Sequence, residues 1–230
     1  MRISHEAIYQ YVYQQIHRKG NGLVKKGCED LRIYLVRRHK RRAKKGFRKA
    51  QKAERATLLP SIENRSRVVD ERSRVGDWED DIITSKKSLV CVKSINERKT
   101  GVVFFKKTLN GTAKICDEAV RNRLSIIPSK YRKTLTRDRG SENKAYETLA
   151  KDLDLDIFFT HAYCSYERGS NENNNGLFRR YFPKKTNFAN ISDEDVAKVE
   201  YLINSRPRKR LDGFTPYEIF YKETGVALIP

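Results

Sequence analysis

The stretch from Tyr166 to Phe182 reads Tyr-Glu-Arg-Gly-Ser-Asn-Glu-Asn-Asn-Asn-Gly-Leu-Phe-Arg-Arg-Tyr-Phe. Its start is too polar for an ordinary core helix, and its end is too apolar for a disordered loop. We predict a helix whose polar start places the carboxylate of Glu172 at a site. Glu167, about 140° around the helix from Glu172, is expected to be structural. The aromatic residues from Phe178 to Phe182 are expected to pack in the core rather than stack on bases.

The composition of the chain is strongly basic. Its 230 residues include 49 Lys and Arg against 29 Asp and Glu, a formal net charge of +20, and 38% are hydrophobic. A protein this basic usually meets a polyanion, because each phosphate it neutralises releases a counterion. The alternatives are a charged surface that is merely solvated, and an anionic membrane, for which the chain has no strongly apolar amphipathic helix. A polyanion is therefore the expected partner.

The cysteines and the apolar runs limit the class of protein further. The four cysteines are far apart and form no C-x-x-C pair, so neither a zinc site nor a disulfide framework is expected. Cys91 and Cys116 lie in apolar runs and are predicted to be core residues. No signal peptide is visible, and no apolar run reaches the roughly 18 residues of a membrane-spanning helix. We expect a protein of the reducing cytoplasm.

The first part of the chain, residues 1–57, is predicted to be a helical and basic extension. Helices are expected over Ile3–Ile16 and Glu29–Val36. From Val36 to Arg55, eleven residues are Lys or Arg and only Glu54 is acidic. We interpret this run as a connector that lies on a phosphate backbone; the alternative is a solvated linker. Its candidate DNA contacts are Arg37, Arg38, Lys40, Arg41, Arg42, Lys44 and Lys45.

After a lead-in segment, 58–74, an α/β core is predicted over 75–225. Val75–Thr84 is a strand in which Asp77, Glu79 and Asp81 share one face, with Trp78, Asp80 and Ile82 on the other. Further strands are expected over Leu89–Ile95, Gly101–Lys107, Lys133–Thr136 and Asp156–Thr160. A helix is expected over Thr112–Ile127, another follows Ser141, and capping boxes at Ser192/Asp195 and Thr215/Glu218 begin two more. The order predicts a mixed five-stranded sheet flanked by helices.

Three acids stand out in this core. Asp81 lies in the first strand, Asp138 lies where the fourth strand ends, and Glu172 follows after 33 intervening residues. Sites gather where strands of an α/β sheet finish. Converging carboxylates repel one another, and hard oxygen ligands of this kind favour Mg²⁺ or Mn²⁺. Any one of these acids alone is more often a surface residue; the combination with the basic run and the polar helix suggests metal-dependent phosphoryl transfer.

Several motifs together resemble a known family. Gly76–Ile83, Thr136–Glu142 and Tyr163–Lys184 look like the integrase-core transposases of bacterial insertion sequences, specifically the insertion-sequence-thirty family. Asn204–Glu218 is similar to its closing motif, and Ser4–Tyr9 is similar to the motif ahead of its basic region. The resemblance implies a ribonuclease-H-like fold. It also implies a catalytic D-D-E triad of Asp81, Asp138 and Glu172 that holds two Mg²⁺ or Mn²⁺ ions.

The resemblance also suggests DNA contacts and shows three departures. Arg179, seven residues after Glu172, matches a basic position that many such enzymes use to hold a DNA end, and the other candidates are Arg168, Arg206, Arg208 and Lys209. Asp80 stands where the family often has Gly, and Arg139 stands where many integrase cores have Asn. Helix-turn-helix segments, usual before the first motif, are not visible. We therefore expect the catalytic two-thirds of a transposase.

These observations predict a DNA transposase. It would cut at the ends of a mobile element and join the freed 3′-hydroxyl to target DNA, as a homo-oligomer on DNA, in the bacterial cytoplasm with the nucleoid and without a membrane partner. One alternative is a catalytically silent, truncated transposase that acts as a DNA-binding protein. Another is a ribonuclease-H-like nuclease, which would cut without joining.

Overall fold

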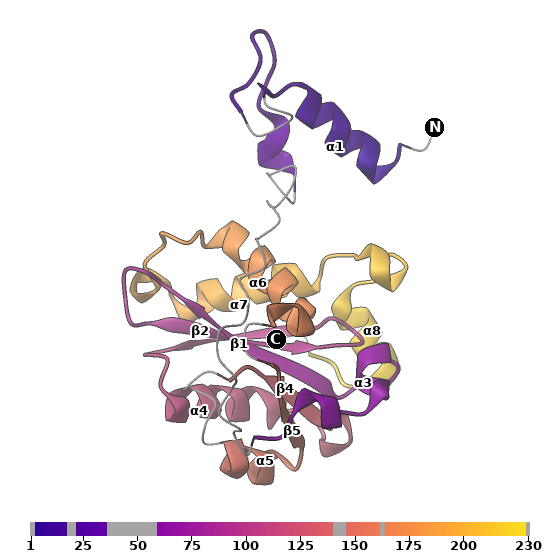
Figure 1. The fold of residues 1–230 in the computed structure, drawn as a ribbon, viewed down its shortest axis with the longest axis vertical. Helices are drawn as coiled ribbons and strands as arrows, with labels where there is room; N and C mark the ends of the chain where they lie inside the picture. The colour runs from indigo at the N-terminus through magenta and orange to yellow at the C-terminus, as the bar shows by residue number, and fades with distance from the viewer. Residues whose placement is uncertain (1–2, 18–21, 36–58, 140–145, 162–163, 229–230) are drawn as a thin grey trace. The chain divides into compact units, whose positions relative to one another are not determined.

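The computed structural model describes residues 3–17, 22–35, 59–139, 146–161 and 164–228. The chain divides into two compact units, Met1–Arg55 and Ala56–Pro230 (Figure 1). Each unit is described by itself. No helix in the described ranges is both long enough and apolar enough to cross a membrane.

The first unit is a small helical element. Helix α1 spans His5–Gln14, and its N-cap Ser4 accepts a hydrogen bond from the backbone N–H of Ala7 at 3.1 Å. The helix predicted over Ile3–Ile16 is therefore present but shorter. Where a second helix was predicted, the structure has the 3₁₀ turn η1, Leu31–Tyr34. Val12, Tyr13 and Leu35 form a small core, with Tyr9 and Leu31 packed against it. The basic candidates between 37 and 45 lie outside the described residues.

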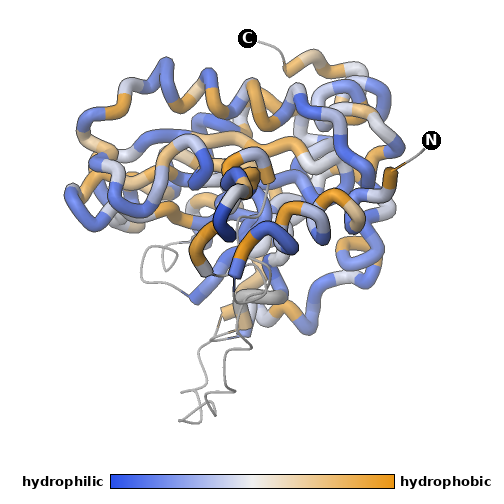
Figure 2. Tube along the Cα trace, turned by 90° about the horizontal axis from the view of Figure 1, so that it is seen from above, coloured by the Kyte–Doolittle hydropathy of each residue, from blue (hydrophilic) through white to orange (hydrophobic). Residues whose placement is uncertain are grey.

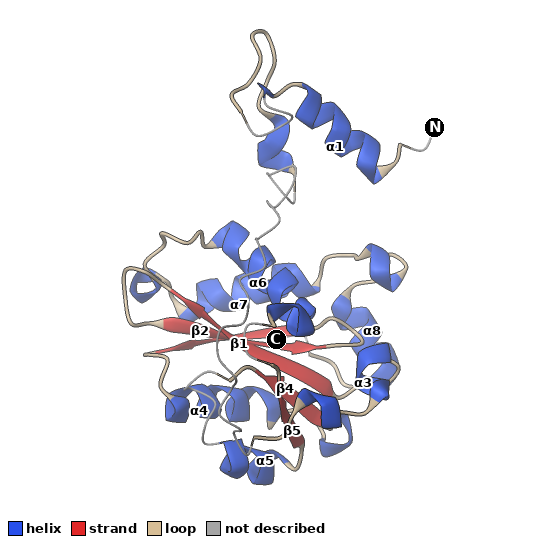
Figure 3. Cartoon of the chain, in the orientation of Figure 1, coloured by secondary structure: helices blue, strands red, loops and turns tan. Residues whose placement is uncertain are grey.

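The second unit is built on a mixed five-stranded sheet, as predicted (Figure 3). The strand order is β3-β2-β1-β4-β5. Strand β2 pairs antiparallel with both β1 and β3, whereas β4 pairs parallel with both β1 and β5. The bounds are β1 Asp77–Thr84, β2 Cys91–Glu97, β3 Val103–Thr108, β4 Thr134–Arg137 and β5 Asp156–Phe159.

Helices cover both faces of this sheet (Figure 1). On one face lie α4 and α5, and on the other lie α6 and α7. Capping boxes begin α7 and α8, as predicted. The side chain of Ser192 accepts from the backbone N–H of Asp195, and the Asp195 carboxylate accepts from the backbone N–H of Ser192. Thr215 and Glu218 form the same pair of hydrogen bonds at the start of α8. The bounds are α3 Arg67–Glu71, α4 Ala113–Leu124, α5 Tyr146–Leu153, α6 Gly169–Tyr181, α7 Asp193–Asn204 and α8 Pro216–Thr224.

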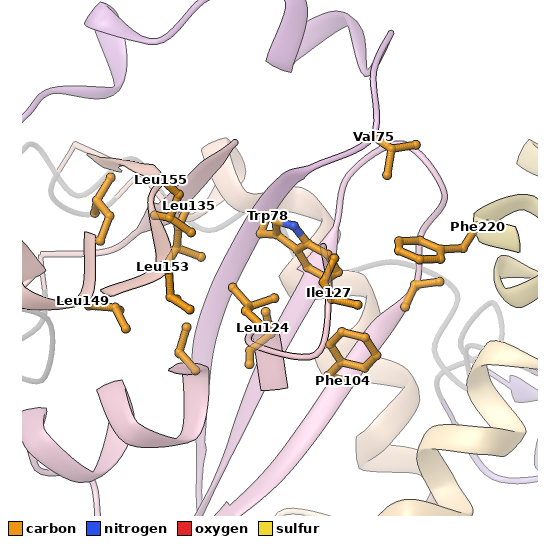
Figure 4. Packing of buried hydrophobic residues seen from close by; sticks show 14 of the residues in the cluster. Val75, Trp78, Phe104, Leu124, Ile127, Leu135, Leu149, Leu153, Leu155 and Phe220 are labelled. Atoms are coloured by element: carbon orange, nitrogen blue, oxygen red, sulfur yellow. The ribbon is translucent and has the colours of Figure 1, made fainter. Parts of the chain in front are cut away.

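A hydrophobic core lies on each face of the sheet. Trp78 is fully buried on the α4 side, where its ring stacks on Phe104 at 5.5 Å and its Nε1 donates to the carbonyl of Tyr131 at 3.0 Å (Figure 4). Phe178 of α6 is fully buried on the other side, with its ring 4.6 Å from that of Phe105. The prediction that the aromatic end of α6 packs in the core is confirmed. Hydrophobic and hydrophilic residues alternate along the coiled, helical parts of the chain (Figure 2).

Both outer strands of the sheet have their backbone groups bonded by other segments. At β5, the N–H of Phe159 donates to the carbonyl of Pro60 at 2.8 Å, and Ser61 forms a parallel bridge with Phe159. At β3, the amide of Asn204 on α7 bonds both backbone groups of Val103, at 2.9 and 2.7 Å. One turn earlier on α7, the Glu200 carboxylate accepts from the N–H of Phe105 at 2.6 Å. The lead-in segment and α7 therefore occupy edge positions at Phe159 of β5 and at Val103 and Phe105 of β3.

Cys91 and Cys116 are buried, as their positions in apolar runs predict.

Candidate active site

The parallel pairing of β1 and β4 brings two of the predicted acids together. In this pairing Glu79 is opposite Thr136. Asp81 and Asp138 each lie two residues further along, on the same face as that pair, because side chains alternate along a strand. Their side chains are 24% and 33% exposed, so both are open to solvent. The two carboxylates therefore stand next to each other, Asp81 within β1 and Asp138 just after the end of β4.

A guanidinium group lies between these two carboxylates. Arg168 Nη1 is 3.1 Å from Asp81 Oδ1, and its Nη2 is 3.1 Å from Asp138 Oδ2. Nη1 also donates to the backbone carbonyl of Asp80 at 2.9 Å. Burial lowers the pKa of Arg168, but the Asp81 and Asp138 carboxylates outweigh burial and hold that pKa above its ordinary value. Arg168, predicted as a DNA contact, is here a counterion of the acids.

Helix α6 supplies a hydrogen-bond donor to Asp81 and carries the third acid. The Asn175 amide donates to Asp81 Oδ2 at 2.7 Å. Glu172 lies in the first turn of α6 with an exposed side chain. It is three residues before Asn175, so it projects from the side of α6 that carries the Asn175 contact to Asp81. In the described ranges no group of three or more His, Cys, Asp or Glu residues is arranged to hold a metal. The triad with Glu172 stays a prediction.

Three buried asparagines dock α6 on the sheet, and sequence reasoning missed them. Asn96 of β2 donates its amide to Asn171 Oδ1 and accepts from the Asn174 amide. Asn171 also donates to the carbonyl of Asp80 at 3.0 Å. All three asparagines are at most 2% exposed. The i, i+3 spacing of Asn171 and Asn174 within a polar helix start was the signal that could have indicated a buried polar face.

Asp80 lies on the opposite face of β1, as its position in the strand predicts. Its carboxylate is 2.9 Å from Lys93 Nζ and 2.9 Å from Arg137 Nη2, and Arg137 Nη1 is 2.7 Å from Asp117 Oδ1. Burial raises the pKa of Asp80, but the charges of Arg137 and Lys93 outweigh burial and hold it below its ordinary value. Asp80 therefore stays ionised inside the protein and faces away from Asp81.

The remaining candidate DNA contacts lie in different surroundings. Arg179 donates to the carbonyl of Thr84 at 2.5 Å and lies over the ring of Phe188 at 5.1 Å. Arg206 and Lys209 are exposed. Arg208 is partly buried and donates to Asn174 Oδ1 at 3.2 Å. Within the described part of the chain, the structure brings only Arg168 into contact with the acids.

The donor set at Asp81 and Asp138 fits a hard cation. Both side chains offer carboxylate oxygens, both are partly exposed, and both already converge on one positive group. Carboxylate oxygens in such a cluster are ligands that Mg²⁺ and Mn²⁺ prefer. The geometry therefore supports a cation site between the middle of β1 and the end of β4.

The chain is similar to curated transposases over almost its whole length. It is 34% identical over 226 residues to the transposase for insertion sequence element IS4351 of Bacteroides fragilis, covering 95% of this chain and 64% of that protein. It is 33% identical over 232 residues to the transposase InsI for insertion sequence element IS30A of Escherichia coli (strain K12), covering 99% of this chain and 57% of that protein. The chain therefore spans about three fifths of the length of these relatives. No protein-family model matches the chain.

Solved structures share the fold at low sequence identity. The crystal structure of the catalytic core domain of BIV integrase aligns with a TM-score of 0.50 and 19% identity, covering 64% of this chain and 93% of that one. A chain in the cryoEM structure of the simian T-cell lymphotropic virus intasome in complex with PP2A regulatory subunit B56 gamma aligns with a TM-score of 0.52 and 16% identity, covering 77% of this chain and 59% of that one. The second unit thus has the ribonuclease-H-like fold of integrase catalytic cores. The chain is thus similar, along at least 95% of its own length, to the transposases of insertion sequence elements IS4351 and IS30A.

Proposed function

We propose that this protein is a DNA transposase, a polynucleotidyl transferase that cuts at the ends of a mobile element and joins them to target DNA. The observation that carries the proposal is the pair of partly exposed carboxylates in an integrase-type core, Asp81 in β1 and Asp138 just after β4. Its relatives are insertion-sequence transposases. Residues 75–225 would be the catalytic core, 58–74 the lead-in, and 1–57 a DNA-binding extension, with copies assembling on DNA.

The reaction would run in two displacements at phosphorus. Water attacks the phosphodiester at the element end, the bond to the 3′ oxygen breaks, and a 3′-hydroxyl is released. That hydroxyl then attacks a target phosphodiester, forming the new bond as a target oxygen leaves. Bound by Asp81, Asp138 and Glu172, two Mg²⁺ or Mn²⁺ ions would supply charge stabilisation at the attacking and leaving oxygens.

Residues around the acids would orient them. The amide of Asn175 fixes one oxygen of Asp81, which leaves that carboxylate a single orientation. Arg168 lies between Asp81 and Asp138 and offsets their repulsion while no metal is bound, and the metal ions would displace it. Arg179, Arg206, Lys209 and the basic run 37–45 would hold phosphates of the DNA.

The test is Mg²⁺-dependent cleavage and joining of oligonucleotides that carry element ends. Asp138→Asn and Glu172→Gln are each expected to reduce both activities at least about a hundredfold, because charge stabilisation of several kcal/mol is lost. Glu147→Gln, an exposed carboxylate on α5, is the matched control and should retain full activity. Activity that survives either site substitution would show that the triad assignment is wrong.

The same assay separates the two alternatives. A ribonuclease-H-like nuclease would cut the substrate without joining it. A catalytically silent DNA-binding protein would do neither, and calorimetry would show no Mg²⁺ binding that depends on Glu172.

A further inference from the structure

Three arginines converge on the turn between β2 and β3, residues 98–101. Arg72 donates to the carbonyl of Arg98 at 3.4 Å, and Arg210 donates to the carbonyl of Lys99 at 3.0 Å. A Cβ built on Gly101 would lie 2.7 Å from Arg210 Nη2 and 3.4 Å from Arg208 Nη1. Those two nitrogens are therefore no further apart than the sum of these distances, 6.1 Å. We call Arg72, Arg208 and Arg210 the arginine cluster.

Gly101 is part of how this cluster is built. Its φ is +77°, a conformation that side chains rarely adopt, and a methyl group there would collide with the Arg210 guanidinium. The positive φ suits glycine, and the absence of a side chain leaves room for the two guanidinium groups beside the turn.

The hydrogen bonds of the cluster all go to neutral oxygens. Arg72 Nη2 donates to Ser170 Oγ at 3.0 Å, and Arg208 donates to Asn174 Oδ1 at 3.2 Å and to the carbonyl of Ile203 at 3.4 Å. The ion pairs found among the described residues include none of the three arginines. Nearby Lys99 pairs instead with Glu223 at 2.6 Å. The protein thus assembles like charges there and bonds them only to uncharged acceptors.

The positive charges of the cluster act on one another. Burial, with the charges of Arg210 and Arg206, lowers the pKa of Arg208 to about 10. Burial and the charge of Arg72 lower the pKa of Arg210, although Glu97 opposes the shift. The Glu97 carboxylate itself accepts from Thr100 and from the N–H of Gly76, so it is already engaged. Repulsion of this kind is relieved when an anion binds.

The cluster lies on the opposite flank of α6 from the carboxylates. Its contacts on α6 are Ser170 and Asn174, each two residues from Glu172 and therefore about 160° around the helix from it. Arg168 and Asn175 contact Asp81 on the Glu172 side. A helix is about 10 Å across, so a DNA strand crossing the start of α6 could reach both places.

We propose that the arginine cluster binds a backbone phosphate of the DNA, separate from the phosphate that reacts at Asp81 and Asp138. Guanidinium groups match the geometry of phosphate oxygens and form bidentate hydrogen bonds with them. The choice of DNA as the anion rests on the proposed function. The site would hold the strand across the start of α6 while the reacting phosphate lies at the carboxylates.

The test measures the salt dependence of DNA binding by the full chain. Duplex oligonucleotide binding is followed by fluorescence anisotropy between roughly 50 and 200 mM salt. Arg210→Gln and Arg72→Gln are each expected to lower the slope of log Kd against log salt by up to about 0.9, the value for one lost phosphate contact on duplex DNA. The matched control is Arg121→Gln on α4, across the sheet, which removes the same charge from a pair with Asp152 and should leave the slope unchanged.

Thermal unfolding without DNA checks that the variants are folded. Arg210→Gln removes a repelled charge, so its Tm should not fall, whereas inorganic phosphate should raise the Tm of the unaltered protein more than that of Arg210→Gln. Equal salt slopes for Arg210→Gln and Arg121→Gln would overturn the proposal. If the two variants have equal salt slopes but the protein cleaves DNA in a Mg²⁺-dependent way, the proposed function stands and the phosphate site at the arginine cluster is wrong. If the salt slopes differ but no cleavage occurs, the arginine cluster stands as a DNA-phosphate site without the transposase activity.

Discussion

The two faces of strand β1 carry two ion-pair networks that differ in their access to water. On the α4 face, Asp80, Lys93, Arg137 and Asp117 have side chains that are at most 6% exposed. On the α6 face, Asp81 and Asp138 are 24% and 33% exposed around Arg168. Each network joins β1 to β4, and consecutive residues of these strands contribute to opposite networks. We call the buried network on the α4 face the closed network and the partly exposed network on the α6 face the open network. Both are held by the same pair of strands.

The difference separates positioning from chemistry. The charged side chains of the closed network keep their ion-pair partners, because a charge left unpaired in the protein interior is costly. The open network can replace its cation without opening the core, because water stabilises the exposed carboxylates meanwhile. Asp80 immediately precedes Asp81, and Arg137 immediately precedes Asp138. The buried ion pair between Asp80 and Arg137 therefore holds β1 and β4 together directly beside the two site carboxylates. The following four predictions test this comparison.

The largest expected effect is on the closed network. Asp80→Ala leaves Lys93 and Arg137 buried without their shared carboxylate and should lower the free energy of unfolding by about 3–5 kcal/mol. Asp81→Ala on the open face should lower it by about 1 kcal/mol or less. Urea denaturation of both variants measures the difference. Equal losses would mean that the two networks do not differ in the way described.

The second effect concerns the docking of α6, which carries Glu172. Asn96→Ala leaves the amide groups of Asn171 and Asn174 without their partner and should cost about 1–3 kcal/mol. Asn173→Ala, exposed on the same helix, is the control and should change stability by at most about 0.5 kcal/mol. Hydrogen exchange of α6 should quicken in the Asn96 variant alone. An unchanged exchange rate would count against docking through this trio.

The third effect sharpens the description of the open network. Arg168→Gln removes a cation that already occupies the space between Asp81 and Asp138. Mg²⁺ affinity of the DNA-free protein should therefore rise by about tenfold, which corresponds to about 1.4 kcal/mol. Calorimetric titration measures it, with Arg180→Gln, exposed on α6, as the control. Weaker binding by Arg168→Gln would mean that the arginine supports the cation site instead of competing for it.

The smallest effect is a pH dependence beside the open network. The hydrogen bond with Glu167 raises the pKa of His161, with smaller contributions from Glu63 in the same direction and from burial and Arg139 against it. Because the pKa is higher in the folded than in the unfolded state, the stabilisation is present at low pH and is lost as pH rises through the folded value. His161→Gln should therefore lower Tm at pH 5 and not at pH 9. A Tm difference that is the same at both pH values would contradict this.

Much of the fold could be predicted from local patterns. The alternation along Val75–Thr84 predicted which side chains of β1 share a face, and the residue pairs Ser192/Asp195 and Thr215/Glu218 predicted where two helices begin. Predicted ends were less exact: β3 begins at Val103 rather than Gly101, and α6 begins at Gly169 after a 3₁₀ turn over Ser165–Arg168. Pattern alone does not fix such ends, because tertiary hydrogen bonds decide them.

The site was predictable only where it depends on strand ends. Asp81 and Asp138 follow from the parallel pairing of two strands, which the order of elements suggests. The contact of Arg168 with both acids and the burial of Asn171 and Asn174 depend on how α6 is rotated against the sheet. That rotation is set by partners such as Asn96, 75 residues earlier in the chain, which no local pattern reveals.

The covered edges of the sheet have a consequence for how copies of this protein can associate. An open edge strand is a template for another chain, leading either to strand addition or to aggregation. Here the backbone at Pro60 and Ser61 occupies the β5 edge, and Asn204 and Glu200 bond the outward amides of β3. Neither edge can accept a partner strand at those positions without first losing these bonds. If copies of the protein associate, addition of a strand at Phe159, Val103 or Phe105 would first have to break these bonds, so contacts through helices and loops are favoured there over sheet extension.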